Sequence, residues 1–233
     1  MHTNSLAQSA PATQSTTAPQ PQSAPTAILN FAQASARLQQ LLQRDARTLL
    51  GIIGPPGSGK SNLSLRLQAL HPERSQIVPM DGYHLANVEL ARLGRVARKG
   101  APDTFDSYGY VALLKRLRQQ GADEIVYAPE FRREIEEPVA GAIPIFASAQ
   151  LLIAEGNYLA LDQGGWSQVA PLLDEIWYVE VDAALRLQRL VERHMQFGRS
   201  RQAAEDWVQS TDEPNARLIE STLGRVHFKV LTD

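Results

Sequence analysis

Eight consecutive residues of this chain have the types and spacing that bind a nucleoside triphosphate. Gly54-Pro55-Pro56-Gly57-Ser58-Gly59-Lys60-Ser61 reads G-x-x-x-x-G-K-S, the phosphate-binding P-loop. Its glycines let the backbone curl so that successive N–H groups point at phosphate oxygens. Lys60 can reach the β- and γ-phosphates, and the Ser61 hydroxyl can ligate Mg²⁺. We therefore predict a site for ATP and Mg²⁺ formed by this loop and by Asn62, which follows it.

The segments around the loop are those that must position it. Residues 48–53 form a short apolar run typical of a buried strand, and leucines recur at helical spacing after Ser61. A helix that begins near Lys60 adds its positive N-terminal end to the phosphate site. Further strands are expected at residues 76–80, 124–128, 151–154, 175–181 and 227–231, and further helices at 108–119, 183–195, 203–208 and 215–223. This alternation predicts an α/β fold: a P-loop NTPase three-layer sandwich with a central, mostly parallel sheet and a helical lid.

Two different stretches precede the first expected strand. Residues 1–27 are mostly Ser, Thr, Ala, Gln and Pro, and we expect a disordered tail there, followed by one domain at 28–233. From residue 28 an amphipathic helix is expected to pack beside the first strand. The apolar face of this helix is assigned to Ile28, Phe31, Ala32, Leu38, Leu41 and Leu42.

Composition limits the class of function. Lys and Arg number 23 and Asp and Glu 25, so the net charge is −2, which argues against a nucleic-acid partner. The chain has no cysteine, which excludes disulfides and thiolate catalysis. Residues 1–27 lack the pattern of a secretory signal, and polar residues, glycine and proline interrupt the most apolar stretch, 140–161. We expect a soluble cytoplasmic protein, monomeric or homodimeric, with no membrane segment.

Carboxylates follow two of the expected strands. Asp81 comes after the second strand and Glu155 directly after the fourth. Because parallel strands bring their carboxyl ends to one edge of the sheet, both side chains should converge with Lys60 and Ser61. Glu155 would then hold Mg²⁺ together with Ser61, and Asp81 would be a base toward an acceptor hydroxyl. The alternatives are that Asp81 only forms a turn and that Glu155 only pairs with an arginine.

Four segments occur in an order that is more specific than the P-loop alone. They are Gly54–Ser61, Met80-Asp81-Gly82-Tyr83-His84-Leu85, Arg98-Lys99-Gly100-Ala101-Pro102-Asp103-Thr104-Phe105-Asp106 and Glu155-Gly156-Asn157-Tyr158-Leu159. In this order they resemble the phosphoribulokinase, uridine kinase and pantothenate kinase family. The likeness extends from about Leu49 to Leu223 and is strongest to a bacterial branch of nucleoside/nucleotide kinase-like proteins, some of them labelled fructose-transport kinases.

The resemblance implies transfer of the γ-phosphoryl group of ATP to a hydroxyl of a small molecule: a sugar, a nucleoside or a pantothenate-like alcohol. It implies that Asp81 is the base, that Lys60 supports the leaving phosphates, and that a lid at about 193–204 closes over them with Arg193 and Arg199. The residues expected to bind the acceptor are Asp81, Tyr83, His84, Arg98, Lys99, Asp103, Phe105, Asp106, Phe131, Arg132 and Tyr158.

Plainer interpretations remain for several of these residues. The loop that holds Arg98 and Lys99 has only a polar composition, which is typical of a solvated loop, and His84 could simply be buried. Arg186 and Arg189 share one helix face with Arg193, and such a face is usually solvated. For residues 212–215 we favour a helix cap over a contact with the nucleotide.

Two positions depart from the pattern of the family branch. Ala86 stands where that branch usually has Asp, and Phe131-Arg132-Arg133 stands where it favours Phe-Asp-Arg. Two outcomes are open: these changes favour a more anionic acceptor, or they leave the pocket weakly active. A rival function is a nucleotide-hydrolysing switch that binds a protein partner, although the chain lacks an Asn-Lys-x-Asp motif. A dinucleotide-binding dehydrogenase is excluded because the glycines do not follow the order G-x-G-x-x-G.

Overall fold

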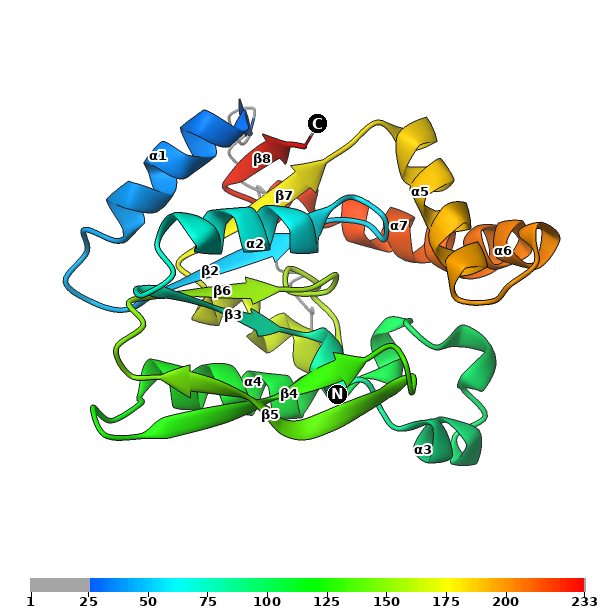
Figure 1. Cartoon of the computed structure of the whole chain (residues 1–233), viewed down its shortest axis with the longest axis horizontal. Helices are drawn as coiled ribbons and strands as arrows, with labels where there is room; N and C mark the ends of the chain where they lie inside the picture. Colours follow the sequence, from blue (N-terminus) through cyan, green and yellow to red (C-terminus); the bar gives the residue numbers. More distant parts are fainter. Residues whose placement is uncertain (1–25, 233) are drawn as a thin grey trace, which may run out of the picture.

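The centre of the structure is a sheet of six strands in the order β1-β8-β7-β2-β6-β3, all of them parallel to their neighbours. The computed structural model describes residues 26–232 (Figure 1). The strands of this sheet are β1 Ala27–Leu29, β2 Thr48–Ile53, β3 Ser75–Pro79, β6 Leu151–Glu155, β7 Glu175–Glu180 and β8 Phe228–Leu231. The predicted parallel sheet is therefore confirmed.

The helices follow the strands along the chain, as the alternating pattern predicted. They are α1 Phe31–Leu41, α2 Lys60–Leu70, α3 Asn87–Arg92, α4 Ser107–Arg118, α5 Ala183–Gln196, α6 Arg201–Trp207 and α7 Glu213–Glu220. A single π-helical turn, Val208–Asp212, joins α6 to α7. None of the helices within residues 26–232 is long and apolar enough to cross a membrane.

Strand β2 shows how the sheet is covered on both faces. All six of its residues are buried, as expected for a central strand of a parallel sheet. Leu50 and Ile52 belong to an apolar cluster with residues of α1 and α2. Leu49 and Ile53 belong to a second cluster, which includes the buried face of α4. Because neighbouring residues of a strand point to opposite faces, these two clusters define a three-layer sandwich.

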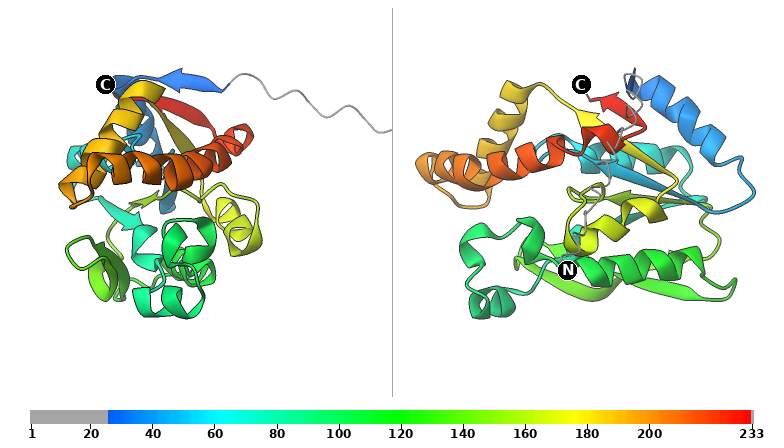
Figure 2. Two further views of the ribbon diagram at one scale, coloured as in Figure 1. Left: turned by 90° about the vertical axis from the view of Figure 1, so that its right-hand side faces the viewer. Right: turned by 180° about the vertical axis from the view of Figure 1, so that it is seen from behind.

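A separate antiparallel hairpin was only half predicted. The strand expected at 124–128 is the first part of β4, Ile125–Arg132, which pairs with β5, Glu137–Phe146. We did not predict β5, because Pro138, Gly141 and Pro144 interrupt its apolar pattern. Proline is tolerated here because each strand of a two-stranded sheet has one edge without a hydrogen-bonded neighbour. Helix α4 lies behind the hairpin in Figure 1 and in front of it in the reverse view of Figure 2.

The expected helix from residue 28 was partly wrong. Residues 27–29 form strand β1, and α1 begins only after Asn30, whose side chain accepts a hydrogen bond from the N–H of Gln33 at 2.9 Å. Ile28 and Ala32 are exposed, whereas Ala34 is buried with Leu38 and Leu41 on the face of α1 that meets the sheet. Of the predicted tail, residues 1–25 lie outside the described part, and Ala27 already pairs with Phe228.

The two sides of one end of the molecule are formed by different parts of the chain. Helices α5, α6 and α7 lie on one side of this end, and α3 and the turn of the β4–β5 hairpin lie on the other (Figures 1 and 2). Strands β2, β6 and β3, which are neighbours in the sheet, all finish here, and the residues that follow each of them face the space between the two sides.

Candidate active site

The P-loop connects β2 to α2 in a conformation that depends on glycine. Gly57 and Gly59 have φ angles of +80° and +90°, which side chains rarely adopt. A Cβ at Gly57 would lie 2.8 Å from Leu190 and 3.0 Å from the carbonyl oxygen of Arg186, so the loop packs tightly on α5. Lys60 begins α2, and its Nζ donates to the carbonyl oxygen of Pro55 at 3.3 Å. The loop and the N-terminus of α2 thus form the cradle for phosphates that the sequence predicted.

The two predicted carboxylates do converge on this cradle. Glu155 ends β6, and its Oε2 accepts a hydrogen bond from the Ser61 hydroxyl at 3.3 Å. Asp81 follows β3, the next strand of the sheet. Burial raises the pKa of Glu155 to about 7, although the positive charge of Lys60 opposes this rise. Burial also lowers the pKa of Lys60, and the charges of Glu155 and Asp81 oppose that lowering.

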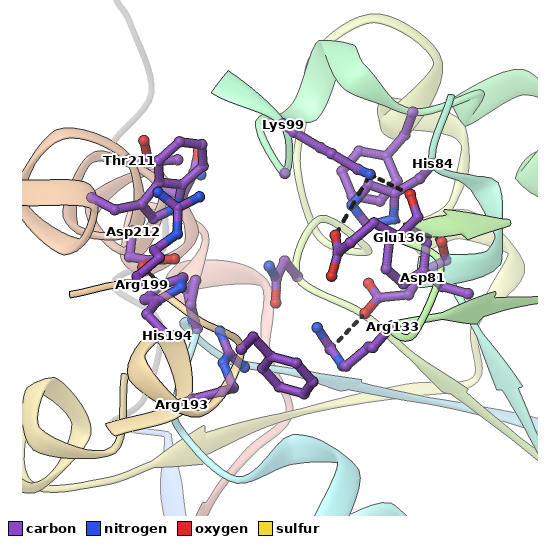
Figure 3. A pocket seen from close by; sticks show the side chains of 18 of the residues that line it. Asp81, His84, Lys99, Arg133, Glu136, Arg193, His194, Arg199, Thr211 and Asp212 are labelled. Carbon is purple, nitrogen blue, oxygen red and sulfur yellow. Dashed lines mark hydrogen bonds and ion pairs between the residues drawn. The ribbon is translucent and has the colours of Figure 1, made fainter. Parts of the chain in front are cut away.

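Asp81, Lys60, Ser61 and Glu155 line one cavity of about 560 Å³. Two further groups of residues complete it, and Figure 3 shows them facing each other across the opening. We call the first the hairpin wall; it consists of His84, Lys99, Phe131, Arg133 and Glu136. We call the second the helical wall; it consists of Arg193, His194, Arg199, Thr211, Asp212 and Asn215.

The hairpin wall surrounds Asp81 with aromatic and cationic groups. The ring of His84 lies between Phe105 and Phe131, with centroid distances of 3.9 and 4.6 Å, and its Nδ1 is 2.7 Å from the carbonyl oxygen of Asp81. Burial lowers the pKa of His84, which favours the neutral ring. Arg133 lies 3.7 Å from the carboxylate of Asp81. The carboxylate of Asp81, the predicted base, therefore has the guanidinium of Arg133 beside it.

The helical wall contains the two arginines of the predicted lid. Desolvation lowers the pKa of Arg193, as does the charge of Arg133. Arg199 lies over the ring of Trp207, 4.0 Å from the centroid. Between these arginines, Gly198 separates α5 from α6 with a φ angle of +95°. The helical segment therefore changes direction at Gly198, and its role as a lid stays a prediction.

Residues 212–215 do more than cap a helix. Asp212 makes no side-chain cap on α7, and its Oδ2 instead lies 2.7 Å from Nε2 of His194 on α5. A helix does begin in this segment, as predicted, but Asp212 at its N-cap position forms no side-chain cap. Nearby, Arg186 is buried and pairs with Glu213, so the solvated face expected for Arg186 was wrong.

Several residues expected to bind the acceptor lie outside the cavity and support its walls. Asp103 pairs with Arg98 at 2.6 Å, and Asp106 accepts the N–H of Gly109 at 2.8 Å as the N-cap of α4. Tyr83 packs against Tyr110. The residues predicted to bind the acceptor that do not line the cavity are Tyr83, Arg98, Asp103, Asp106, Arg132 and Tyr158. The residues predicted to bind the nucleotide that do not line it are Gly54, Pro55, Gly57, Ser58, Gly59 and Asn62. Their predicted roles in binding stay predictions.

Predicted residues that do line the cavity are Pro56, Lys60, Ser61, Asp81, His84, Lys99, Phe105, Phe131, Glu155, Arg193 and Arg199. Lining residues that the sequence did not single out as site residues include Arg133, Glu136, His194, Trp207, Thr211, Asp212 and Asn215. Arg133 matches the arginine of the Phe-Asp-Arg pattern, but the site was assigned to its neighbour Arg132, the position that departs from the pattern, and Arg132 pairs with Glu130 at 3.2 Å.

Comparison with known proteins identifies the family to which the chain belongs. No protein-family model matches the chain. An "ATP-dependent kinase-like protein" of Aspergillus versicolor is 41% identical over 145 residues, which are 59% of this chain and 84% of that protein. A "putative uridine kinase" of Schizosaccharomyces pombe is 36% identical over 174 residues, 70% of this chain and 72% of that protein.

A solved structure has the same arrangement over nearly its whole length. The crystal structure of a "putative fructose transport system kinase" from a Silicibacter species aligns with a TM-score of 0.75 and 36% sequence identity, covering 85% of this chain and 98% of that one. These relatives share the P-loop kinase fold that the cradle and the cavity described above require. The chain therefore belongs to the uridine kinase-like family of P-loop kinases, whose shared activity is ATP-dependent phosphoryl transfer to a small molecule.

Proposed function

We propose that this protein transfers the γ-phosphoryl group of ATP to a hydroxyl of a sugar, a nucleoside or a pantothenate-like alcohol, with the assistance of Mg²⁺. The observation that carries the proposal is that Lys60, Ser61, Glu155 and Asp81 line one cavity together with arginines of the helical wall. Phosphoryl transfer requires a phosphate cradle, a metal, a group that positions the nucleophile, and cations for the developing charge. Each of these parts has a candidate here.

Ser61 and Glu155 are suitable ligands for a magnesium ion. One hydroxyl and one carboxylate, 3.3 Å apart at the end of the phosphate cradle, are typical of Mg²⁺, which keeps waters and substrate phosphates among its ligands. Bound there, the ion would neutralise charge on the β- and γ-phosphates. Glu155 is paired with no arginine among the described residues, which favours the metal-binding interpretation over the ion-pair alternative.

Asp81 fits the part of the base. In the proposed reaction the acceptor oxygen forms a bond to the γ-phosphorus while the bond from that phosphorus to the bridging oxygen breaks. The electron pair of the broken bond leaves with ADP, and the hydroxyl proton moves to the carboxylate of Asp81. Arg133, 3.7 Å away, helps to orient this carboxylate. Lys60, Arg193 and Arg199 supply positive charge where negative charge develops.

The test is the replacement Asp81→Asn, which keeps the shape of the side chain and removes the base. We expect kcat to fall by about 10²–10⁴-fold while the affinity for ATP stays close to normal. The acceptor is found by following ATP consumption and product mass with a panel of hydroxyl compounds. Asp123→Asn, an exposed aspartate ahead of β4, is the matched control. Full activity in the Asp81 variant would refute its role, and ATP hydrolysis that no acceptor stimulates would favour the switch.

A further inference from the structure

Glu136, in the turn of the β4–β5 hairpin, has a backbone conformation that glycine usually adopts. Its φ angle is +52°, the only positive φ of a non-glycine residue within residues 26–232. Such a conformation is strained for a residue with a Cβ, and it persists only where the surroundings hold it. A turn alone would favour glycine at this position. The side chain of Glu136 therefore needs another explanation.

The surroundings hold the main chain of Glu136 and direct its side chain. Lys99 Nζ and Asn87 Nδ2 both donate to the carbonyl oxygen of Glu136, the latter at 3.1 Å. The carboxylate of Glu137 accepts the N–H of Asn87 at 3.0 and 3.1 Å, so the hairpin turn is fixed to the start of α3. The carboxylate of Glu136 points into the cavity between Lys99 and Asp81, as Figure 3 shows, and about half of this side chain is exposed.

The helical wall offers polar groups without partners opposite this carboxylate. Thr211 and Asn215 line the cavity and are only 7% and 8% exposed. Neither side chain makes a hydrogen bond to any residue between 26 and 232. The π-helical turn 208–212, a feature often found at functional sites, contains Thr211 and immediately precedes α7, which carries Asn215. Their polar atoms are accessible from the cavity and have no protein partner among the described residues, so both side chains are available to bind a ligand.

The charges of the two walls are already balanced. Of the lysine and arginine side chains not assigned to the phosphates, Lys99 lies 3.6 Å from Glu136 and Arg133 lies 3.7 Å from Asp81. Arg132, whose presence was one reason to consider an anionic acceptor, pairs with Glu130 and does not line the cavity. An acceptor would therefore meet hydrogen-bonding groups but few positive charges without a partner.

We propose that Glu136 is a specificity-determining residue that accepts hydrogen bonds from hydroxyls of an uncharged, polyhydroxylated acceptor, and that Thr211 and Asn215 bind the same molecule from the helical wall. This inference rests on the proposed function, because it concerns the molecule whose hydroxyl Asp81 deprotonates. A carboxylate accepts hydrogen bonds from two neighbouring hydroxyls, and it repels a phosphate or carboxylate placed beside it.

The first experiment compares acceptors of the two kinds. Free hexoses, pentoses, linear polyols and ribonucleosides are offered beside sugar phosphates, glycerate and pantothenate at equal concentration, and the phosphorylated product is identified by mass. We expect the highest kcat/KM with an uncharged acceptor. A preference for an anionic acceptor that disappears in Asp81→Asn would overturn this inference and leave the proposed function standing. Absence of any Asp81-dependent product would overturn both.

The second experiment replaces Glu136 itself. Glu136→Gln should raise KM for the uncharged acceptor by about ten- to a hundredfold, the value of a hydrogen bond to a charged group, while KM for ATP changes by less than about twofold. Glu134→Gln, an exposed glutamate of the same turn that does not line the main cavity, is the matched control. A role limited to fixing Lys99 would instead lower Tm and alter both KM values together.

A third variant keeps the inference testable if the glutamine variant folds poorly. Glu136→Gly suits the positive φ angle and retains the carbonyl oxygen that binds Lys99 and Asn87. We expect Tm to be unchanged or higher and KM for the uncharged acceptor to rise as in Glu136→Gln. A folded glycine variant with the KM of the original protein would overturn the assignment.

Discussion

The phosphate site and the acceptor side of the cavity are built in opposite ways. The phosphate site is one uninterrupted loop between β2 and α2, and its shape depends on backbone angles at Gly57 and Gly59. The acceptor side is assembled from side chains of several segments far apart in the chain, among them His84, Glu136 and Thr211. The first binds with its backbone N–H groups and the second with its side chains.

This difference explains how one kinase fold can take different acceptors. A backbone cradle changes little when side chains change, so it retains its ligand, the phosphates. Walls made of side chains on a hairpin turn and on short helices can be altered one residue at a time without disturbing the sheet. Under the proposed function, specificity would depend on the hairpin turn and the short helices and not on the sheet.

Among the variants that compare the two halves, the largest effect is expected for Lys60 in the phosphate site. Lys60→Met removes the cation of the phosphate cradle and should lower kcat by about 10²–10³-fold, because a positive charge in a site shielded from water stabilises the transition state strongly. Steady-state kinetics with the best acceptor measures the loss. Lys115→Met, on the outer side of α4 where Lys115 contacts Gln168 at 3.4 Å, should leave kcat unchanged. A loss of less than about tenfold in the Lys60 variant would show that the phosphate site does not depend on this side chain.

The sheet could be predicted because its strands carry their own signal. Residues 48–53 and 151–154 are continuous apolar runs, and burial on both faces of a parallel sheet requires such runs. Strand β5 has no such apolar run, because most of its residues are exposed or only partly buried. Its prolines are compatible with an edge strand. Ile28 was misassigned because an exposed edge strand can follow the same apolar pattern as the start of a helix.

The site could be predicted only where it follows a strand. Asp81 and Glu155 were found because the ends of parallel strands meet at one edge. Arg132 was chosen over Arg133 because it replaces the Asp of the family pattern; the sequence does not show that β4 ends at Arg132 and that Arg133 is the residue that lines the cavity. Glu136 was missed because its position depends on contacts with Asn87 and Lys99, which the sequence does not place beside it. Asp212 was assigned to a helix cap because its contact with His194 is made only when α5 and α7 pack together.

A glycine substitution in each half provides a sharper comparison. Gly57→Ala and Gly94→Ala both force alanine into a positive φ angle, +80° and +66°, but only at Gly57 does the new Cβ meet other atoms. Gly57→Ala should weaken ATP binding by about tenfold or more, since the strain of about 1–3 kcal/mol lies in the phosphate cradle.

Gly94→Ala is the matched control for strain alone. It should lower Tm by a few degrees with unchanged affinity for ATP, because a Cβ at Gly94 has no neighbour within 4 Å. Calorimetric titration with ATP and a thermal melt of each variant measure the two effects. Equal losses of ATP affinity in both variants would mean that the cradle does not depend on the close contact with α5.

The smallest effect is expected for a residue that the sequence placed in the acceptor site and the structure places beside it. Arg98 forms an exposed ion pair with Asp103, and exposed pairs contribute about 0–1 kcal/mol, so Arg98→Ala should change KM for the acceptor by less than about threefold. Its neighbour Lys99 is nearly buried and holds Glu136 in place, so Lys99→Met should raise that KM by about tenfold. Kinetics of both variants with one acceptor compares them directly. A larger rise in KM for Arg98→Ala than for Lys99→Met would instead indicate that Arg98 binds the acceptor and that Lys99 does not.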